Sequence, residues 1–185
     1  TNPGVLYQQN TIRDAMVAAL TLNIFNKHSD RIMMANIAQT VNVLQAMILT
    51  DAQKMVLTPT YYVFKMFKEH QNNMLLGSFI TTDKIDSKEA KRSCPQLIES
   101  ASIDENDIIY STVVNVADKK SAKIKCQIAD RKVKNIKAYV LNGDIHDKND
   151  FDCRGAIPWK YKVSNFAEWM DENHTFGYQA INREK

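Results

Sequence analysis

The 185-residue sequence has no run of about 18 consecutive apolar residues, so no segment is predicted to span a membrane. It holds three cysteines, Cys94, Cys126 and Cys153, an odd number without C-x-x-C spacing. This pattern predicts neither a disulfide framework nor a zinc site. The four histidines are scattered and form no H-x-x-x-H pair, so the residues themselves predict no metal site.

Strong charge of either sign is also missing. The net charge of +3 and the charged fraction are ordinary, so charge predicts no nucleic-acid partner. Basic residues gather at Lys119–Lys120 and Lys132–Lys137, among apolar residues. A solvated strand face is favoured there over a phosphate-binding patch.

The beginning of the chain lacks both a methionine and a signal segment. The opening letters TNPG are typical of the interior of a loop. We therefore expect the chain to be a piece of something longer.

Helix-capping signals occur at two places in the first seventy residues of the chain. Asn10 or Thr11 is a candidate N-cap, with Asp14 placed for a capping box, and the helix should run to about Asn26. A later helix should begin after Thr58, with a proline at its first position, and end near His70. The aromatic side chains of this later helix are predicted to be core; a sugar-stacking platform is the alternative.

Between these helices lies the most informative stretch of the chain. Ile32 to Ala38 is a solid apolar run, which predicts a strand buried on both faces, as in a parallel sheet. Asn36 and Gln39 fall at or near its carboxyl end, where barrel enzymes place residues that touch substrate. A second helical stretch is predicted from about Val41 to Leu49. Capping of the strand end is the other interpretation of Gln39.

The character of the sequence changes after Gly77. Residues 78–93 are polar and irregular, which indicates a linker or crossover. From Pro95 onward the apolar period is near two, which predicts strands at 96–103, 108–116, 122–128 and 136–140. Such spacing is typical of an antiparallel sandwich. The residues after Cys153 are rich in aromatics but show no period.

Three linked segments carry a family resemblance. They are LYQQNTIRDAMVAALTLNIFNKHSDRI, MANIAQTVNVLQAMILT and KMVLTPTYYVF, which together cover residues 6–64. In order and spacing they resemble the end of the barrel of glycoside hydrolase family 51 α-L-arabinofuranosidases. The later stretch NGDIHDKNDFD resembles the sandwich of the same family, whereas the family's usual closing strand is not visible after Cys153.

The resemblance implies a retaining glycosidase that releases terminal arabinofuranose, with no metal or organic cofactor. In that family, a glutamate in an N-E pair and a glutamate in a D-E-W context do the chemistry, and neither pattern occurs here. We therefore assign no catalytic carboxylate. The resemblance makes Gln39 a substrate contact, since an amide offers a sugar hydroxyl both a donor and an acceptor. It gives Asn36 a weaker, mainly supporting role.

The predicted fold class is α/β plus all-β. Residues 1–76 would supply the terminal βα units of a (β/α)8 barrel, 77–94 a linker, and 95–185 a jelly-roll-like antiparallel β-sandwich with a divergent tail at 153–185. The fragment alone is predicted to be inactive and poorly soluble. A non-catalytic carbohydrate-binding or assembly module is the alternative, and a pseudogene-like product is a third reading.

Partners and location follow from the same resemblance. We expect arabinose-containing polysaccharides or oligosaccharides and the missing N-terminal part of the same enzyme as partners. The family leaves a homo-oligomer open, and neither nucleic acid nor a membrane is expected. A bacterial cytoplasm or periplasm is the expected location.

Overall fold

The computed structural model describes residues 10–38, 40–87, 89, 91–129, 133–151, 159–163 and 176–183, with only the backbone for residue 134 and the last two segments. A six-stranded sheet with the strand order β3-β6-β7-β10-β8-β9 forms its centre. The strands are β3 (Met74–Leu76), β6 (Leu97–Ile103), β7 (Ile108–Asn115), β8 (Val133–Leu141), β9 (Trp159–Val163) and β10 (Phe176–Arg183). All neighbouring pairs in this sheet are antiparallel.

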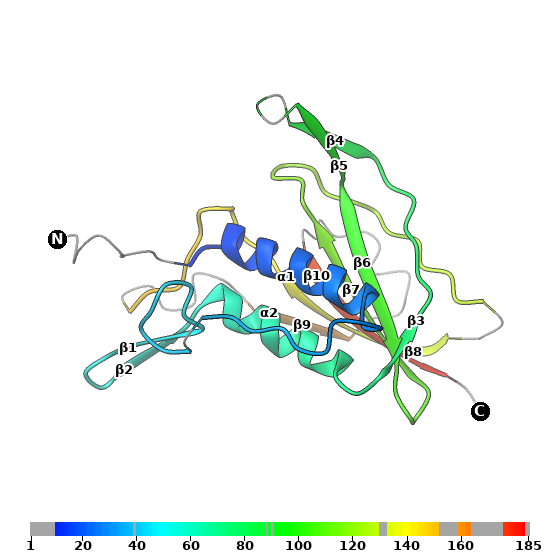
Figure 1. The fold of residues 1–185 in the computed structure, drawn as a ribbon, viewed down its shortest axis with the longest axis horizontal. Coiled ribbons are helices and arrows are strands. Elements are labelled where there is room, and N and C mark those ends of the chain that lie inside the picture. The colour runs from blue at the N-terminus through cyan, green and yellow to red at the C-terminus, as the bar shows by residue number, and fades with distance from the viewer. Residues whose placement is uncertain are drawn as a thin grey trace.

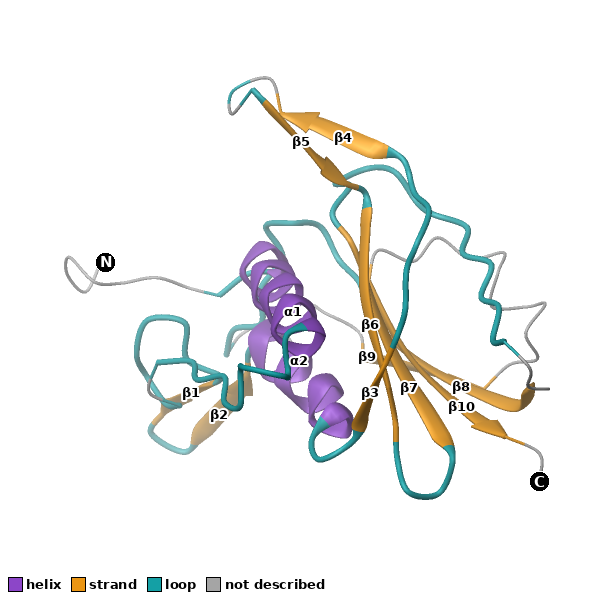
Figure 2. Cartoon of the chain, turned by 45° about the vertical axis from the view of Figure 1, so that its right-hand side comes forward, coloured by secondary structure: helices purple, strands orange, loops and turns teal. Residues whose placement is uncertain are grey.

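Two helices cover one face of the sheet (Figures 1 and 2). Helix α1 (Ile12–Lys27) packs beside α2 (Pro59–Phe67), which continues into the short 3-10 helix η1 (Lys68–His70). Ala15 and Ala19 of α1 are almost fully buried, so the small side chains allow close packing. The helices form one core cluster with Val114 of β7 and Leu141 of β8.

The helices predicted to end near Asn26 and to begin after Thr58 are confirmed, and local chemistry explains where they begin. The backbone N–H and the hydroxyl of Thr11 each donate to Asp14, 2.9 Å away in both cases. The N–H groups of Ile12 and Arg13 donate to the carbonyls of Asp147 and Ile145, so a distant loop satisfies donors that a helix start leaves free. Pro59 opens α2 as predicted.

The opposite face of the sheet carries a second, smaller cluster. Ile103, Ile109 and Ile136 are buried there, and Cys126 and Ile128 pack against them. The predicted strand at 122–128 is wrong, because these residues join no ladder. The predicted alternation is nevertheless present, because exposed and half-buried residues alternate along the segment. Its apolar side chains Cys126 and Ile128 pack toward the sheet. An alternation of apolar and polar residues indicates that one side of an extended segment is buried. It does not require hydrogen bonds to a neighbouring strand.

Two small hairpins stand apart from the sheet. One pairs β1 (Ile48–Asp51) with β2 (Lys54–Leu57), and the other pairs β4 (Lys84–Ser87) with β5 (Arg92–Pro95). The second projects beyond the end of β6 (Figure 1). Most of it falls in the stretch 78–93 that was predicted to be irregular, so the prediction of irregularity is wrong there.

The C-terminal strand β10 is a strand of the sheet that the sequence did not predict. It lies between β7 and β8 and pairs with both. The sequence shows no closing strand here, yet Phe176–Arg183 occupies a central position. Within the part of the chain that the structure describes, no helix combines the length and apolar character needed to cross a bilayer.

Candidate functional site

The segment predicted to hold substrate contacts is not a strand here. Residues 32–38 pair with none of the described strands, and Asn36 is exposed. Met33 and Met34, predicted to be buried, are 98% and 75% exposed. The buried-strand prediction is therefore wrong for this chain, because a strand's backbone groups need neighbouring strands and none lies beside this segment. Gln39 lies outside the described residues.

The helix predicted from Val41 to Leu49 is also wrong. Asn42 and Gln45 have φ angles of 54° and 57°, in the left-handed region that a right-handed helix cannot include. The Asn42 side chain donates to the Thr50 hydroxyl and accepts from the Thr50 N–H, each at 2.8 Å. These two hydrogen bonds close a loop that leads into β1. Asparagine side chains often bond to nearby backbone groups in this way, which disfavours a helix.

The glutamates of the described chain lie in an antiparallel strand, in a 3-10 helix and in turns. Glu99 of β6 is buried and forms an ion pair with Lys27, in the last turn of α1. Glu69 is exposed in η1, Glu105 is exposed in the turn between β6 and β7, and Glu89 is exposed in the turn of the β4–β5 hairpin. The remaining glutamates, Glu168, Glu172 and Glu184, lie outside the described residues.

A buried polar network joins the helices to the sheet. Nδ1 of His70 lies 2.8 Å from the Ser102 hydroxyl, and Nε2 lies 3.2 Å from the Thr112 hydroxyl. The hydroxyls of Ser100 and Thr112 donate to Oδ1 of Asn23, at 2.7 and 2.6 Å. Burial lowers the pKa of His70 to about 4, so the imidazole is neutral at physiological pH.

This network serves the fold, because its members are hydroxyls, an amide and a neutral imidazole, without a carboxylate partner for the imidazole among the described hydrogen bonds. The sequence pattern predicts a helix end at His70 but does not indicate this role. A signal was present: Ser100 and Ser102 alternate along β6 and Thr112 lies opposite Ser100 on β7, on the face that receives the helices.

Comparison with known proteins assigns the chain to a protein family. A family model described as "Alpha-L-arabinofuranosidase C-terminal domain" matches residues 1–176. The chain belongs to this family. The α-L-arabinofuranosidase C-terminal domain thus accounts for nearly the whole sequence, and β10 begins at the last matched residue.

Similar curated proteins carry the same enzyme name. The chain is 44% identical over 153 residues to "Intracellular exo-alpha-L-arabinofuranosidase" of Bacteroides ovatus, which covers 82% of this chain and 30% of that protein. It is 26% identical over 140 residues to "Probable alpha-L-arabinofuranosidase C" of Aspergillus clavatus, which covers 72% of this chain and 27% of that protein.

Solved structures agree with these matches. The family 51 arabinofuranosidase of Xanthomonas axonopodis pv. citri superposes with a TM-score of 0.83 at 32% identity, over all of this chain and 38% of that chain. The α-L-arabinofuranosidase of Thermotoga maritima shares the fold, with a TM-score of 0.78 at 22% identity, over 95% of this chain and 39% of that chain. The chain therefore spans between a quarter and two fifths of the relatives that it matches.

Proposed function

We propose that this chain is the C-terminal portion of a retaining, exo-acting α-L-arabinofuranosidase that releases terminal arabinofuranose from arabinan, arabinoxylan and related oligosaccharides. The observation that carries the proposal is the match of residues 1–176 to the C-terminal domain of such enzymes. The 44% identity to the Bacteroides ovatus enzyme, over 30% of its length, supports it.

The chemistry requires two carboxyl groups about 5–5.5 Å apart. One protonates the leaving glycosidic oxygen while the other attacks the anomeric carbon, and the first then deprotonates the water that hydrolyses the glycosyl-enzyme. We assign both groups to glutamates outside this chain, since the sequence lacks the N-E and D-E-W patterns. The 185-residue chain by itself is inactive in this account.

Gln39 is the substrate contact that this chain contributes in our proposal. Its amide would hydrogen-bond a hydroxyl of the arabinofuranosyl ring, with one donor and one acceptor group available. Being neutral, it would leave the pKa values of the nearby carboxylates free of an added charge. Asn36 would support it from the same segment.

The division into domains remains a proposal as well. Residues 1–76 would complete a (β/α)8 barrel, residues 77–94 would connect, and residues 95–185 would form a β-sandwich of jelly-roll type. Exposed apolar side chains support the first assignment: Met33 and Met34 on the unpaired segment, and Val17 and Ile24 seven residues apart on α1. Strands and helices from the rest of the enzyme would cover these side chains.

Two experiments test the proposal: sequencing of the DNA upstream of this chain, and an activity assay of the joined enzyme. The DNA upstream should carry an open frame that encodes the N-E and D-E-W glutamates, and the enzyme from the joined frame should hydrolyse a nitrophenyl arabinofuranoside. Gln39→Ala in that enzyme should lower kcat/KM by about tenfold to a hundredfold, since a hydrogen bond to bound sugar would be lost. A joined enzyme without activity would overturn the proposal.

A second candidate function is that of a non-catalytic carbohydrate-binding or assembly module. A polar hollow at one end of the sheet favours it, as described below. Retention of the chain on insoluble arabinan or xylan, without an upstream catalytic frame, would decide for this candidate.

Location and assembly are further parts of the proposal. We propose a bacterial cytoplasm or periplasm, because the Bacteroides ovatus relative is named intracellular. We also propose that the complete enzyme forms a homo-oligomer, which a measured molar mass in solution would test.

A further inference from the structure

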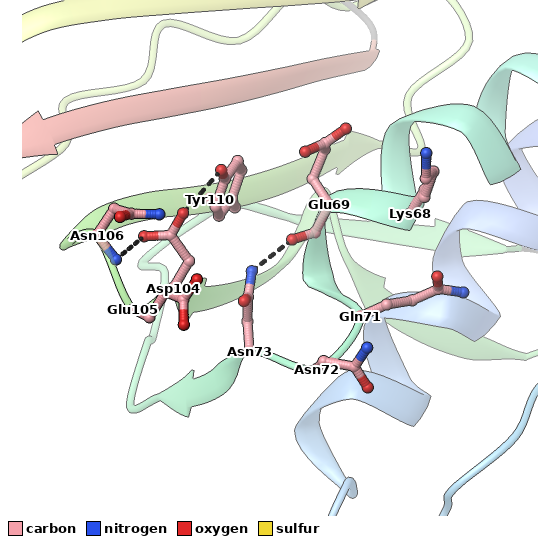
Figure 3. Close-up of a pocket in the computed structure, with 9 residues that line it drawn as sticks. All are labelled: Lys68, Glu69, Gln71, Asn72, Asn73, Asp104, Glu105, Asn106 and Tyr110. Atoms are coloured by element: carbon pink, nitrogen blue, oxygen red, sulfur yellow. Dashed lines mark hydrogen bonds between the residues drawn. The ribbon is translucent and has the colours of Figure 1, made fainter.

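A hollow of about 350 Å³ opens where η1 turns into β3 and β6 turns into β7 (Figure 3). The first turn supplies Gln71 and Asn72, and the second supplies Asp104 and Asn106. Tyr110 of β7 closes the hollow from the sheet side. The lining is therefore built by two turns that lie far apart in the sequence and meet because β3 pairs with β6.

The walls of this hollow are fixed by hydrogen bonds. Oδ1 of Asp104 accepts from the N–H groups of Asn106 and Ile108, at 2.9 and 2.8 Å. The Tyr110 hydroxyl donates to Oδ2 of Asp104 at 3.2 Å. On the opposite wall, the Asn73 amide donates to the backbone carbonyl of Glu69 at 2.6 Å. A ligand would therefore meet a surface that is already shaped, which lowers the entropy cost of binding.

The exposed part of the lining offers many donors and acceptors. The side chains of Gln71, Asn72 and Asn106 carry amides, and those of Glu69 and Glu105 carry carboxylates. Burial and the nearby carboxylates raise the pKa of Tyr110 to about 12, so its hydroxyl keeps its proton at physiological pH. Amides that donate and accept at once suit vicinal hydroxyl groups.

The chemistry of the lining excludes other ligand classes. No group of three His, Cys, Asp or Glu side chains in the described chain is arranged to hold a metal ion. Anions are disfavoured, since three carboxylates line the hollow against one ammonium, that of Lys68. The volume lies at the small end of the range for ligand sites, which suits one or two sugar rings.

We propose that this hollow is a saccharide site, which takes one unit of a neutral arabinose-containing chain. The choice of arabinose rests on the proposed function, whereas the choice of a neutral polyhydroxyl ligand rests on the hollow itself. Such a site would hold the polymer against this part of the enzyme.

The test is a titration of the isotope-labelled chain with arabinotriose, followed by NMR. Amide signals of residues 69–73 and 104–108 should shift in a saturable manner, with a Kd on the order of millimolar. The double variant Gln71→Ala/Asn106→Ala should weaken binding by about tenfold, the effect of losing two ordinary hydrogen bonds. Gln53→Ala, which is exposed and away from the hollow, is the matched control and should bind as the parent chain does.

Absence of saturable shifts up to about 50 mM sugar would overturn the proposal, a concentration far above the expected Kd. So would binding that the double variant leaves unchanged, or shifts produced by calcium chloride at the same amides when the sugar produces none. The readout is binding by this chain, without turnover. A negative result therefore leaves the proposed enzyme function standing, and an inactive joined enzyme leaves a positive titration intact.

Discussion

His70 and Ser102 join the end of the second helix to the sheet through a buried hydrogen bond of 2.8 Å between Nδ1 and the hydroxyl oxygen. Ser102 lies on β6, and the other imidazole nitrogen faces Thr112 on β7. The phenyl ring of Phe67 also lies against the imidazole, with 5.7 Å between the ring centroids. One side chain therefore links η1 to two strands of the sheet.

Acid should destabilise the chain through His70. Its pKa is about 4 in the folded state and about 6.5 in the unfolded state, so the unfolded chain binds the proton more tightly. The stabilisation by neutral His70 is fully present above about pH 6.5 and is lost as the pH falls toward 4. The free energy of unfolding, measured by denaturant titration at about pH 7.5 and about pH 4.5, should fall by about 2–3 kcal/mol from this group.

His70→Gln is the control for this pH effect. It keeps a polar side chain but removes the titrating group, so the loss of stability between the two pH values should shrink by the same amount. An unchanged pH dependence in the variant would show that other groups cause the effect.

Asn23 should be the most sensitive residue of α1. Its Oδ1 accepts from two hydroxyls, and its amide nitrogen donates to the Ile98 carbonyl at 3.2 Å. Asn23→Ala should lower the free energy of unfolding by about 2–3 kcal/mol, because buried hydroxyls lose their acceptor. The loss stays moderate because Ser100 and Thr112 also face each other at 3.1 Å.

Thr21→Ala is the matched control on the same helix, because Thr21 is exposed and its hydroxyl donates to the Val17 carbonyl in its own helix. It should change stability by less than about 0.5 kcal/mol. Equal effects of the two substitutions in a urea titration would contradict the network.

Removal of β10 should open the sheet at its centre. A chain that ends at residue 175 lacks the strand that pairs with both β7 and β8. Amide hydrogen exchange in residues 108–114 and 133–140 should lose most of its protection, since the backbone partners are gone. A chain that ends at Arg183 keeps the strand and is the control. Protection that survives in the shorter chain would contradict the central place of β10.

Met33 tests whether the exposed segment belongs to a larger core. In the isolated chain Met33→Gln should change stability by less than about 0.5 kcal/mol, because the side chain is 98% exposed. In the joined enzyme the same change should cost about 1–3 kcal/mol, if neighbouring strands bury the methionine. Thermal unfolding of both proteins measures the difference. An equally small effect in the joined enzyme would contradict the barrel assignment.

The elements that were predictable from sequence are those that local signals define. Thr11 with Asp14, and Thr58 with Pro59, mark the beginnings of α1 and α2, and both helices form. The alternation of Ile136, Ala138 and Val140 predicted β8, and all three are buried. In each case the residues that decide the structure lie within a few positions of one another.

The elements that were missed depend on distant partners. The apolar run from Ile32 to Ala38 has the composition of a buried strand, but composition cannot supply the strands that would pair with it. Phe176–Arg183 shows no clear period, yet it fills the gap between β7 and β8. The hollow between the two turns was equally hidden, since only the pairing of β3 with β6 brings Asn72 near Asn106.

The most direct measurement is hydrolysis of a nitrophenyl arabinofuranoside by two purified proteins: the 185-residue chain, and the same chain joined to the frame that precedes it in the gene. We predict no turnover above background by the chain alone and turnover by the joined enzyme, with loss of activity when either upstream glutamate is changed to glutamine. Turnover by the chain alone would contradict the account, because it would place both catalytic groups within these 185 residues.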